Sequence, residues 1–334
     1  MLEGYSASSY SLSDLVQLNT DSITLSGLSS GAYMAVQFSI AHSGSINGTA
    51  VFAGGPFYCA ESTLLLAESR CMSHFQGDEV AEELAKYTFD ASELGTIDDV
   101  ENLRNGRMRF YLYSGTDDSV VDPSVMQGLK SYLGLMGVSS SFIEGVFDVD
   151  SEHCLPTDAS GPIFEPCATL SEPYIGECNY DGAGNALKAI LGEEDLKPRV
   201  NMIEDNLIEY SQVEYNVHGS LSSINDVGYI YIPTSCQGGN TSASNCRLHV
   251  SFHGCKQNVQ IIGDTYARYS GFNEWAEANN IVVLYPYVRP SLDGLPLNPK
   301  GCWDWWGYTN DEYGLKSGWQ IEFVHELINA IIVV

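Results

Sequence analysis

The sequence contains few basic residues, and this shortage limits the partners that the chain can bind. Lysine and arginine supply 15 of its 334 residues, against 43 aspartates and glutamates, which gives a formal net charge of −28. Nucleic acids and anionic membrane surfaces are bound by clustered positive charge, so we expect neither as a partner. We interpret the excess acid as a solubility device suited to a salty habitat, and we expect a neutral substrate.

Long apolar runs, internal repeats and low-complexity linkers are also missing. Because a membrane-spanning helix needs about 18 or more consecutive apolar residues, and none are present, we predict no such helix. The first ten residues lack the basic and apolar regions of a signal peptide, so Met1 would fit an expression start on a processed chain. The length and the 44% hydrophobic content allow one large domain or two ordinary ones.

The nine cysteines include no CxxC pair and no cluster with zinc-ligand spacing. We therefore expect no metal site, and instead disulfides formed in an oxidising compartment, which favours secretion. Proximity along the chain suggests the pairs Cys59–Cys71, Cys167–Cys178 and Cys236–Cys246, with Cys255–Cys302 as a longer link. Cys154 would then be the free thiol, although spacing alone does not determine the connectivity.

Strand-like and helix-like segments alternate along the chain. Strands are predicted over residues 22–26, 48–52, 108–113, 141–148, 228–232, 247–252 and 281–285. Helices are predicted over residues 32–42, 123–135, 183–191, 271–279 and 318–331. This alternation is typical of an α/β fold with a mostly parallel sheet and helices on both faces. Residues 193–226 show no clear pattern.

Residues 27–31 read Gly-Leu-Ser-Ser-Gly and match the G-x-S-x-G pattern of a nucleophile elbow. They lie between a predicted strand and a predicted helix, where such an elbow is found. The two glycines would allow a sharp turn that holds the Ser29 hydroxyl above the sheet. The N–H of Ser30 would then point toward a tetrahedral oxyanion at the helix N-terminus. The alternative is a turn that only caps the helix.

Candidates for the acid and the base follow in chain order. Asp117 and Asp118 come after the strand over residues 108–113, at the carboxyl end where α/β sheets bind ligands. Either carboxylate would suit the task of orienting a histidine, and a solvated turn is the alternative. His153 follows the next predicted strand, and α/β-hydrolases run serine, acid, histidine along the chain. The other histidines lack this position.

A His-Gly dipeptide at residues 253–254 follows the strand over residues 247–252. In α/β-hydrolases such a loop supplies the second oxyanion N–H, but it precedes the nucleophile in the chain. Joining the two chain ends would restore the expected order of elements. The sequence therefore predicts a circularly permuted α/β-hydrolase with termini just before the elbow strand. The alternative is an ordinary loop.

Several segments resemble the secreted poly(3-hydroxybutyrate) depolymerases of the circularly permuted, single-domain kind. The matching segments are Gly27–Ala32, Ser114–Val121, His153–Asp158, Cys178–Gly184, Phe252–Gln257 and Asn298–Tyr308. The resemblance implies one catalytic α/β-hydrolase domain over residues 1–334. It also implies an extracellular enzyme acting on a neutral polyester or its oligomers. We expect a monomer.

The resemblance also implies roles for single residues. Ser29 would be the nucleophile, His153 the base and Asp118, the third residue after Gly115, the acid. The oxyanion donors would be the N–H groups of Ser30 and Cys255. One departure is that Cys-Leu follows the histidine where Thr-Phe is expected, which places a thiol beside the base.

Three tryptophans, Trp303, Trp305 and Trp306, would line the polymer site, as the resemblance implies. Flat aromatic walls bury the methyl and methylene groups of a polyester at little entropic cost. A Cys255–Cys302 bond would tie this cluster to the oxyanion loop. Packing in the core is the alternative for any one of the three rings.

The expected reaction is ester hydrolysis through an acyl-enzyme, for which no metal or organic cofactor is needed. Two alternatives stay open at this point. One is a different secreted carboxylesterase, such as a feruloyl, acetylxylan or aromatic-polyester hydrolase, on the same scaffold. The other is a binding protein that keeps the fold but has no catalytic activity.

Overall fold

The computed structural model describes residues 10–192, 196–238, 245–291 and 294–333. Within these residues eight strands form one sheet in the order β4-β3-β2-β1-β10-β11-β9-β8. The strands are β1 (Ile23–Leu28), β2 (Gly48–Phe52), β3 (Arg109–Tyr113), β4 (Ile143–Val146), β8 (Leu207–Ser211), β9 (Val227–Tyr231), β10 (Arg247–Phe252) and β11 (Ile281–Tyr285). All neighbours are parallel except β9, which is antiparallel to β8 and β11. The predicted mostly parallel sheet is confirmed.

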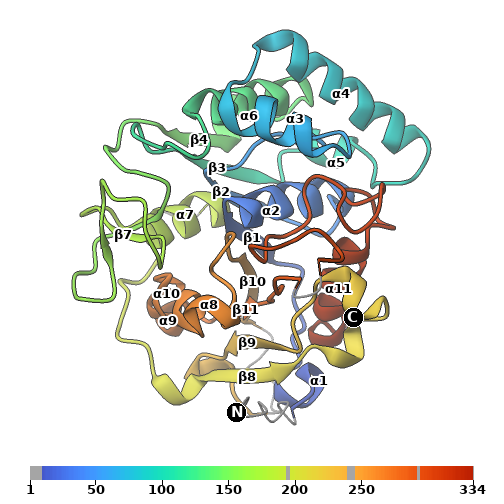
Figure 1. Ribbon diagram of the computed structural model, residues 1–334. Helices are drawn as coiled ribbons and strands as arrows, with labels where there is room; N and C mark the ends of the chain where they lie inside the picture. Colours follow the sequence, from blue (N-terminus) through green and yellow to red (C-terminus); the bar gives the residue numbers. More distant parts are fainter. Residues whose placement is uncertain (1–9, 193–195, 239–244, 292–293, 334) are drawn as a thin grey trace.

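Helices cover both faces of the sheet, as predicted. They are α1 (Leu12–Leu15), α2 (Ser30–Ala41), α3 (Leu64–Glu68), α4 (Asp78–Glu93), α5 (Glu101–Arg104), α6 (Pro123–Leu135), α7 (Gly182–Leu191), α8 (Val259–Ile262), α9 (Thr265–Tyr269), α10 (Phe272–Asn279) and α11 (Trp319–Ile331). Figure 1 shows α7 and α10 on one side of the strands and α2 and α11 on the other. No helix in the described residues is both long and apolar enough to cross a bilayer.

The core lies along the central strands. β1, β2, β9 and β11 are buried over their whole length, and β10 is buried after Arg247, because helices or neighbouring segments cover both faces. Buried polar side chains of β1 and β10 pair with one another. His249 of β10 lies within hydrogen-bond distance of Thr24 Oγ1, at 2.9 Å, and of Ser26 Oγ, at 2.8 Å. Burial lowers the pKa of His249 to about 3, so this histidine is a neutral part of the core.

A second, three-stranded sheet lies outside the main one. It consists of β5 (Leu155–Thr157), β7 (Ile175–Glu177) and β6 (Glu165–Pro166), in that order. β5 packs against α7, and it begins two residues after His153. The segment that carries the predicted base is therefore anchored on this small sheet, which the sequence pattern did not predict.

Four predicted elements have the predicted bounds, namely β2, α6, β10 and β11. The strand predicted over residues 141–148 is shorter, because a 3₁₀ turn at Ser140–Phe142 occupies its start. The side chain of Ser139 accepts a hydrogen bond from the Ser141 N–H and stabilises this turn. The long helix α4 and the edge strand β8 were not predicted.

The cysteines pair as proximity suggested. The structure contains the disulfides Cys59–Cys71, Cys167–Cys178, Cys236–Cys246 and Cys255–Cys302. Cys154 is a buried free thiol, and its Sγ lies 3.9 Å from Sγ of Cys178. Burial raises the pKa of the Cys154 thiol, so it stays protonated near neutral pH.

Candidate active site

A pocket of about 440 Å³ lies at the carboxyl ends of β1, β3 and β10. Its walls are mainly apolar, and the predicted residues Ser29, His153 and Cys255 all line it. Ligand sites of α/β sheets are found at this edge, because the loops that follow the strands converge there. The pocket therefore brings together three loops that are far apart in the sequence.

Ser29 occupies the turn between β1 and α2 in a strained conformation. Its backbone angles are φ 57° and ψ −121°, a region that residues with a side chain rarely adopt. The flanking glycines are needed for close packing. A Cβ on Gly27 would lie 2.1 Å from the carbonyl oxygen of Gly31, and a Cβ on Gly31 would lie 2.2 Å from that of Phe252. These contacts hold the turn in the shape of a nucleophile elbow.

A buried carboxylate holds the ring of His153. Asp118 Oδ2 lies 2.8 Å from His153 Nδ1, and Asp118 Oδ1 accepts the N–H groups of Val120 and Val121 at 2.9 and 2.8 Å. Both side chains are nearly inaccessible to solvent, whereas Asp117 is exposed. An ionised carboxylate accepts only, so Nδ1 carries the proton and Nε2 is left to receive one. The geometry thus favours Asp118 over Asp117.

The loops that carry the acid and the histidine are joined by backbone contacts. Gly115 packs so closely on Ser151 that a Cβ would lie 2.1 Å from the Ser151 carbonyl oxygen. Glu152 Oε2 accepts the N–H of His153 at 2.7 Å and that of Ser119 at 3.2 Å. Burial alone would raise the pKa of Glu152, but these hydrogen bonds lower it, so the side chain is a carboxylate that bridges the two loops.

The loop after β10 lies directly beside Ser29. β1 and β10 are paired in register, and a Cβ on Gly254 would lie 3.4 Å from Cβ of Ser29. The buried ring of His253 positions this loop through contacts of both its nitrogens. Its Nδ1 lies 2.7 Å from the Gly254 carbonyl oxygen, and its Nε2 accepts the N–H of Val288 at 3.2 Å. Burial lowers the pKa of His253 to about 4, which keeps the ring neutral in this role.

Two backbone N–H groups at this point have no acceptor within the described residues. In the loop, the N–H of Gly254 donates to Gln257 Oε1 at 2.6 Å and that of Lys256 donates to the Lys300 carbonyl oxygen at 2.8 Å. The N–H of Cys255, between them, bonds to no described residue. The N–H of Ser30, at the first position of α2, is likewise unpaired, as expected at a helix start. These are the two groups predicted as oxyanion donors.

Two of the three predicted tryptophans line the pocket, and the third lies in the core. Trp305 and Trp306 line the pocket, and Trp305 stacks on Tyr33 with ring centroids 4.2 Å apart. Trp303 is fully buried against Phe252 and is not part of the lining. Its backbone N–H donates to Ser30 Oγ, so the residue is held under the elbow and its ring enters the core. The prediction that Trp303 lines the polymer site is therefore wrong.

Comparison with curated proteins yields two close relatives, although no protein-family model matches the chain. A poly(3-hydroxybutyrate) depolymerase of Delftia acidovorans is 37% identical over 317 residues, which cover 95% of this chain. This chain spans 60% of that relative's length. A polyhydroxybutyrate depolymerase of Talaromyces funiculosus is 33% identical over 324 residues, covering 94% of this chain and 91% of the relative.

This chain belongs to the polyhydroxybutyrate depolymerase family. Solved structures agree with the sequence comparison. The PHB depolymerase from Penicillium funiculosum superposes with a TM-score of 0.81 at 32% identity, covering 95% of this chain and 97% of that one. A serine-to-alanine variant of a PHB depolymerase, complexed with an R3HB trimer, matches with the same values. The family recognised in the sequence and its α/β fold are confirmed.

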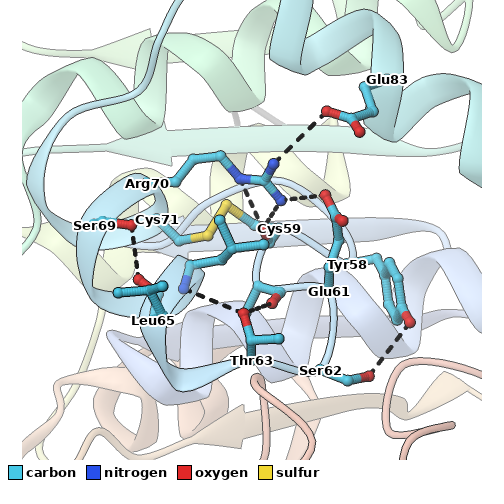
Figure 2. A network of polar contacts seen from close by, with 12 residues as sticks. Tyr58, Cys59, Glu61, Ser62, Thr63, Leu65, Ser69, Arg70, Cys71 and Glu83 are labelled. Atoms are coloured by element: carbon cyan, nitrogen blue, oxygen red, sulfur yellow. Dashed lines mark hydrogen bonds and ion pairs between the residues drawn. A yellow bond between two sulfur atoms is a disulfide. The ribbon is translucent and has the colours of Figure 1, made fainter.

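One wall of the pocket in this depolymerase-family chain was not predicted from sequence. The loop closed by Cys59–Cys71 carries α3, which contributes Leu64, Ala67 and Glu68 to the lining. Figure 2 shows Arg70 at the centre of this loop, donating to the Cys59 carbonyl oxygen and, at 2.6 Å, to Glu61 Oε1. These contacts hold the wall in place.

A second missed residue is Asp304, which organises the tryptophan loop. The carboxylate is fully buried, and its Oδ1 accepts the N–H groups of Trp306, Gly307 and Tyr308, while Oδ2 accepts that of Thr309. Burial raises its pKa even though so many donors surround it. An aspartate three residues before a glycine, within an aromatic cluster, was the signal available in the sequence, because it indicates a tight, side-chain-capped turn.

Proposed function

We propose that this chain hydrolyses the ester bonds of poly(3-hydroxybutyrate), with Ser29 as nucleophile, His153 as base and Asp118 as orienting acid. One observation carries the proposal. A strained serine and a histidine held by a buried carboxylate line one pocket, in a chain whose relatives are named polyhydroxybutyrate depolymerases.

In this reaction His153 Nε2 takes the proton of Ser29, and Ser29 Oγ attacks the ester carbonyl carbon. The N–H groups of Ser30 and Cys255 bind the oxyanion, each contributing about 3–4 kcal/mol of transition-state stabilisation. His153 then protonates the departing hydroxyl end, which leaves an acyl-enzyme. Water repeats the cycle and releases the carboxylic acid. No cofactor takes part in these steps.

The lining of the pocket suits a neutral polyester. Trp305, Trp306 and Tyr33 present flat aromatic surfaces to a chain of methyl and methylene groups. We propose that Trp305 and Trp306 contact the polymer, since both line the pocket while Trp303 does not. The net charge of −28 disfavours a polyanionic substrate.

We also propose that the element order of this chain is a circular permutation. If the strands are numbered from β8 through β11 and on into β1 to β4, the sheet order becomes 1-2-4-3-5-6-7-8. Near the two ends of the described chain, Leu18 forms a parallel bridge with Ile332, and the Leu18 N–H donates to the Ile331 carbonyl oxygen. Adjacent end segments support such a rotation of the chain order.

We further propose a single catalytic domain over residues 1–334 that acts as a secreted, extracellular monomer. The main sheet takes strands from both halves of the chain, which supports one domain. The four disulfides support secretion, because they form in oxidising compartments. The high net charge supports a monomer, since like copies repel one another.

Release of 3-hydroxybutyrate from a polymer film by the wild type and by Ser29→Ala tests the proposed function. We expect release by the wild type and a loss of at least about a thousandfold in the variant, since the nucleophile is absent. Retained release by Ser29→Ala would contradict the assignment. Parallel assays with feruloyl, acetylated-xylan and aryl esters distinguish another carboxylesterase, which would cleave those and leave the film intact. A chain that only binds would cleave none of them.

A further inference from the structure

Two lysines line the pocket of a chain that has few basic residues. Lys256 lies in the oxyanion loop, and Lys300 lies two residues before Cys302. The Lys256 N–H donates to the Lys300 carbonyl oxygen at 2.8 Å, and the Cys255–Cys302 disulfide joins the same two segments. The backbones of the two lysines are therefore held side by side at one part of the pocket wall.

Lys256 and Lys300 are the two basic residues among those that line the pocket, and no described carboxylate forms an ion pair with either of them. Lys316 pairs with Asp98 at 2.6 Å, and Lys86 pairs with Asp90 at 3.1 Å. The contact of Lys256 Nζ is instead the phenol oxygen of Tyr174, at 3.4 Å, and this tyrosine also lines the pocket. Two ammonium groups without an acidic partner, next to each other on one pocket wall, would attract an anion that enters the pocket.

The backbone around Lys256 keeps this charge at the pocket. Lys256 has φ 64°, a left-handed conformation that is strained for a residue with a side chain. It persists because its neighbours are fixed, Cys255 by the disulfide and Gln257 by hydrogen bonds to Gly254 and to the Pro173 carbonyl oxygen. The side chain of Lys256 therefore extends from a backbone position that is fixed beside the catalytic centre.

We propose that Lys256 and Lys300 form a subsite for the terminal carboxylate of a hydroxyacid oligomer. This inference rests on the proposed function, because every ester bond that is cleaved leaves a carboxylate end, while the interior of the polymer is neutral. The lining combines apolar walls for the body of such an oligomer with two ammonium groups and the Tyr174 hydroxyl for its charged end, and Glu68 is the acidic residue in the same lining. The enzyme then binds short free acids better than their capped esters.

The test compares a 3-hydroxybutyrate trimer as the free acid with the same trimer as its methyl ester. The two substrates differ by one charge, so the acid-to-ester ratio of kcat/KM reports the subsite. We expect this ratio to fall about three- to tenfold in the double variant Lys256→Gln, Lys300→Gln, in keeping with partly exposed ion pairs. The wild-type ratio should also fall as salt is added, since salt screens the interaction.

Lys197→Gln is the matched control, because Lys197 is an exposed lysine outside the pocket lining and its loss should leave the ratio unchanged. An unchanged ratio in the double variant, with both substrates affected equally or not at all, would overturn the subsite. Calorimetric binding of the free-acid trimer to Ser29→Ala, with and without the lysine substitutions, measures the same subsite without turnover. If the wild type releases no 3-hydroxybutyrate from the polymer film, the proposed function fails, and this binding measurement still decides the subsite.

Discussion

The two sides of the catalytic pocket are held by different physical means. On the nucleophile side, Ser29 is positioned by backbone contacts between β1, α2 and β10, where Gly27 and Gly31 leave no space for a side chain. On the histidine side, His153 is positioned by carboxylates, with Asp118 at its ring and Glu152 at its backbone. We infer that the first side is sensitive to added volume and the second to changes of charge.

The largest effect should come from the charge that orients His153. In Asp118→Asn an amide replaces the acceptor of the Nδ1 proton, so the ring loses its working tautomer and kcat should fall about 10³–10⁴-fold. Asp117→Asn is the matched control, because the exposed neighbour makes no contact with the ring. Turnover of a soluble ester by both variants measures the difference. Equal losses in the two variants would contradict the assignment of Asp118.

The second-largest effect should come from a side chain added next to Ser29. In Gly31→Ala the new Cβ would lie 2.2 Å from the Phe252 carbonyl oxygen, so the elbow or β10 must move. We expect a loss of about 2–4 kcal/mol in the free energy of unfolding, measured with urea. Gly134→Ala is the control, because that position in α6 has open space around it and alanine favours a helix. Wild-type stability in Gly31→Ala would show that the elbow tolerates volume.

The loop after β10 lies between these two cases, because its backbone is held in place by the side chain of Gln257. Gln257→Ala removes the acceptor of the Gly254 N–H and the donor to the Pro173 carbonyl oxygen. The loop should then lose its alignment, lowering kcat about 10–100-fold with a smaller change in KM. Gln260→Ala, an exposed glutamine in the following helix α8, should leave kcat near the wild-type value. A Gln257 variant with normal kcat would mean that the disulfide alone fixes the loop.

The smallest effect concerns Glu165, on the small sheet beside the histidine segment. Its Oε2 accepts the N–H and hydroxyl of Ser171, while burial raises its pKa to about 7. The unfolded chain ionises this group near pH 4.3, so from about pH 4.3 to 7 the folded state holds the extra proton and stability falls as the pH rises. Titratable neighbours on the same segment are Glu152, His153 and Cys154.

Glu165→Gln removes this dependence. Relative to the wild type, the variant should gain about 1–3 kcal/mol in free energy of unfolding between about pH 4 and pH 8, measured with urea. Glu172→Gln, an exposed glutamate nearby, should show a constant difference across the same range. A constant difference for Glu165→Gln as well would show that this carboxyl group is not perturbed by burial.

The elements whose bounds were predicted correctly have clear local sequence patterns. β2 and β11 are short, mainly apolar runs, β10 alternates polar and apolar residues, and α6 begins with a proline after a capping aspartate. The loops after such strands meet at one edge of the sheet, so a serine, an acid and a histidine can be proposed from chain order alone. Four disulfides could be proposed as well, because each pair but one is close in the sequence.

The missed elements have weaker patterns. The buried face of α4 consists largely of small residues, including Ala81, Ala85 and Ala91, so its apolar periodicity is faint despite its 16 residues. The strands β5, β6 and β7 have only two or three residues each and show no period at all. The burial of Trp303 depends on tertiary contacts with Phe252 and Ser30, which spacing along the chain does not reveal.

Labelling with an organophosphonate tests the central assignment most directly, because such a reagent reacts with a serine only when a base and oxyanion donors activate it. We predict one adduct per chain, located on Ser29 by peptide mass analysis, with loss of ester hydrolysis in step with labelling. Substitution of Asp118 by asparagine should slow the labelling in proportion to kcat. An adduct on another residue, or full activity in labelled protein, would contradict the proposed triad.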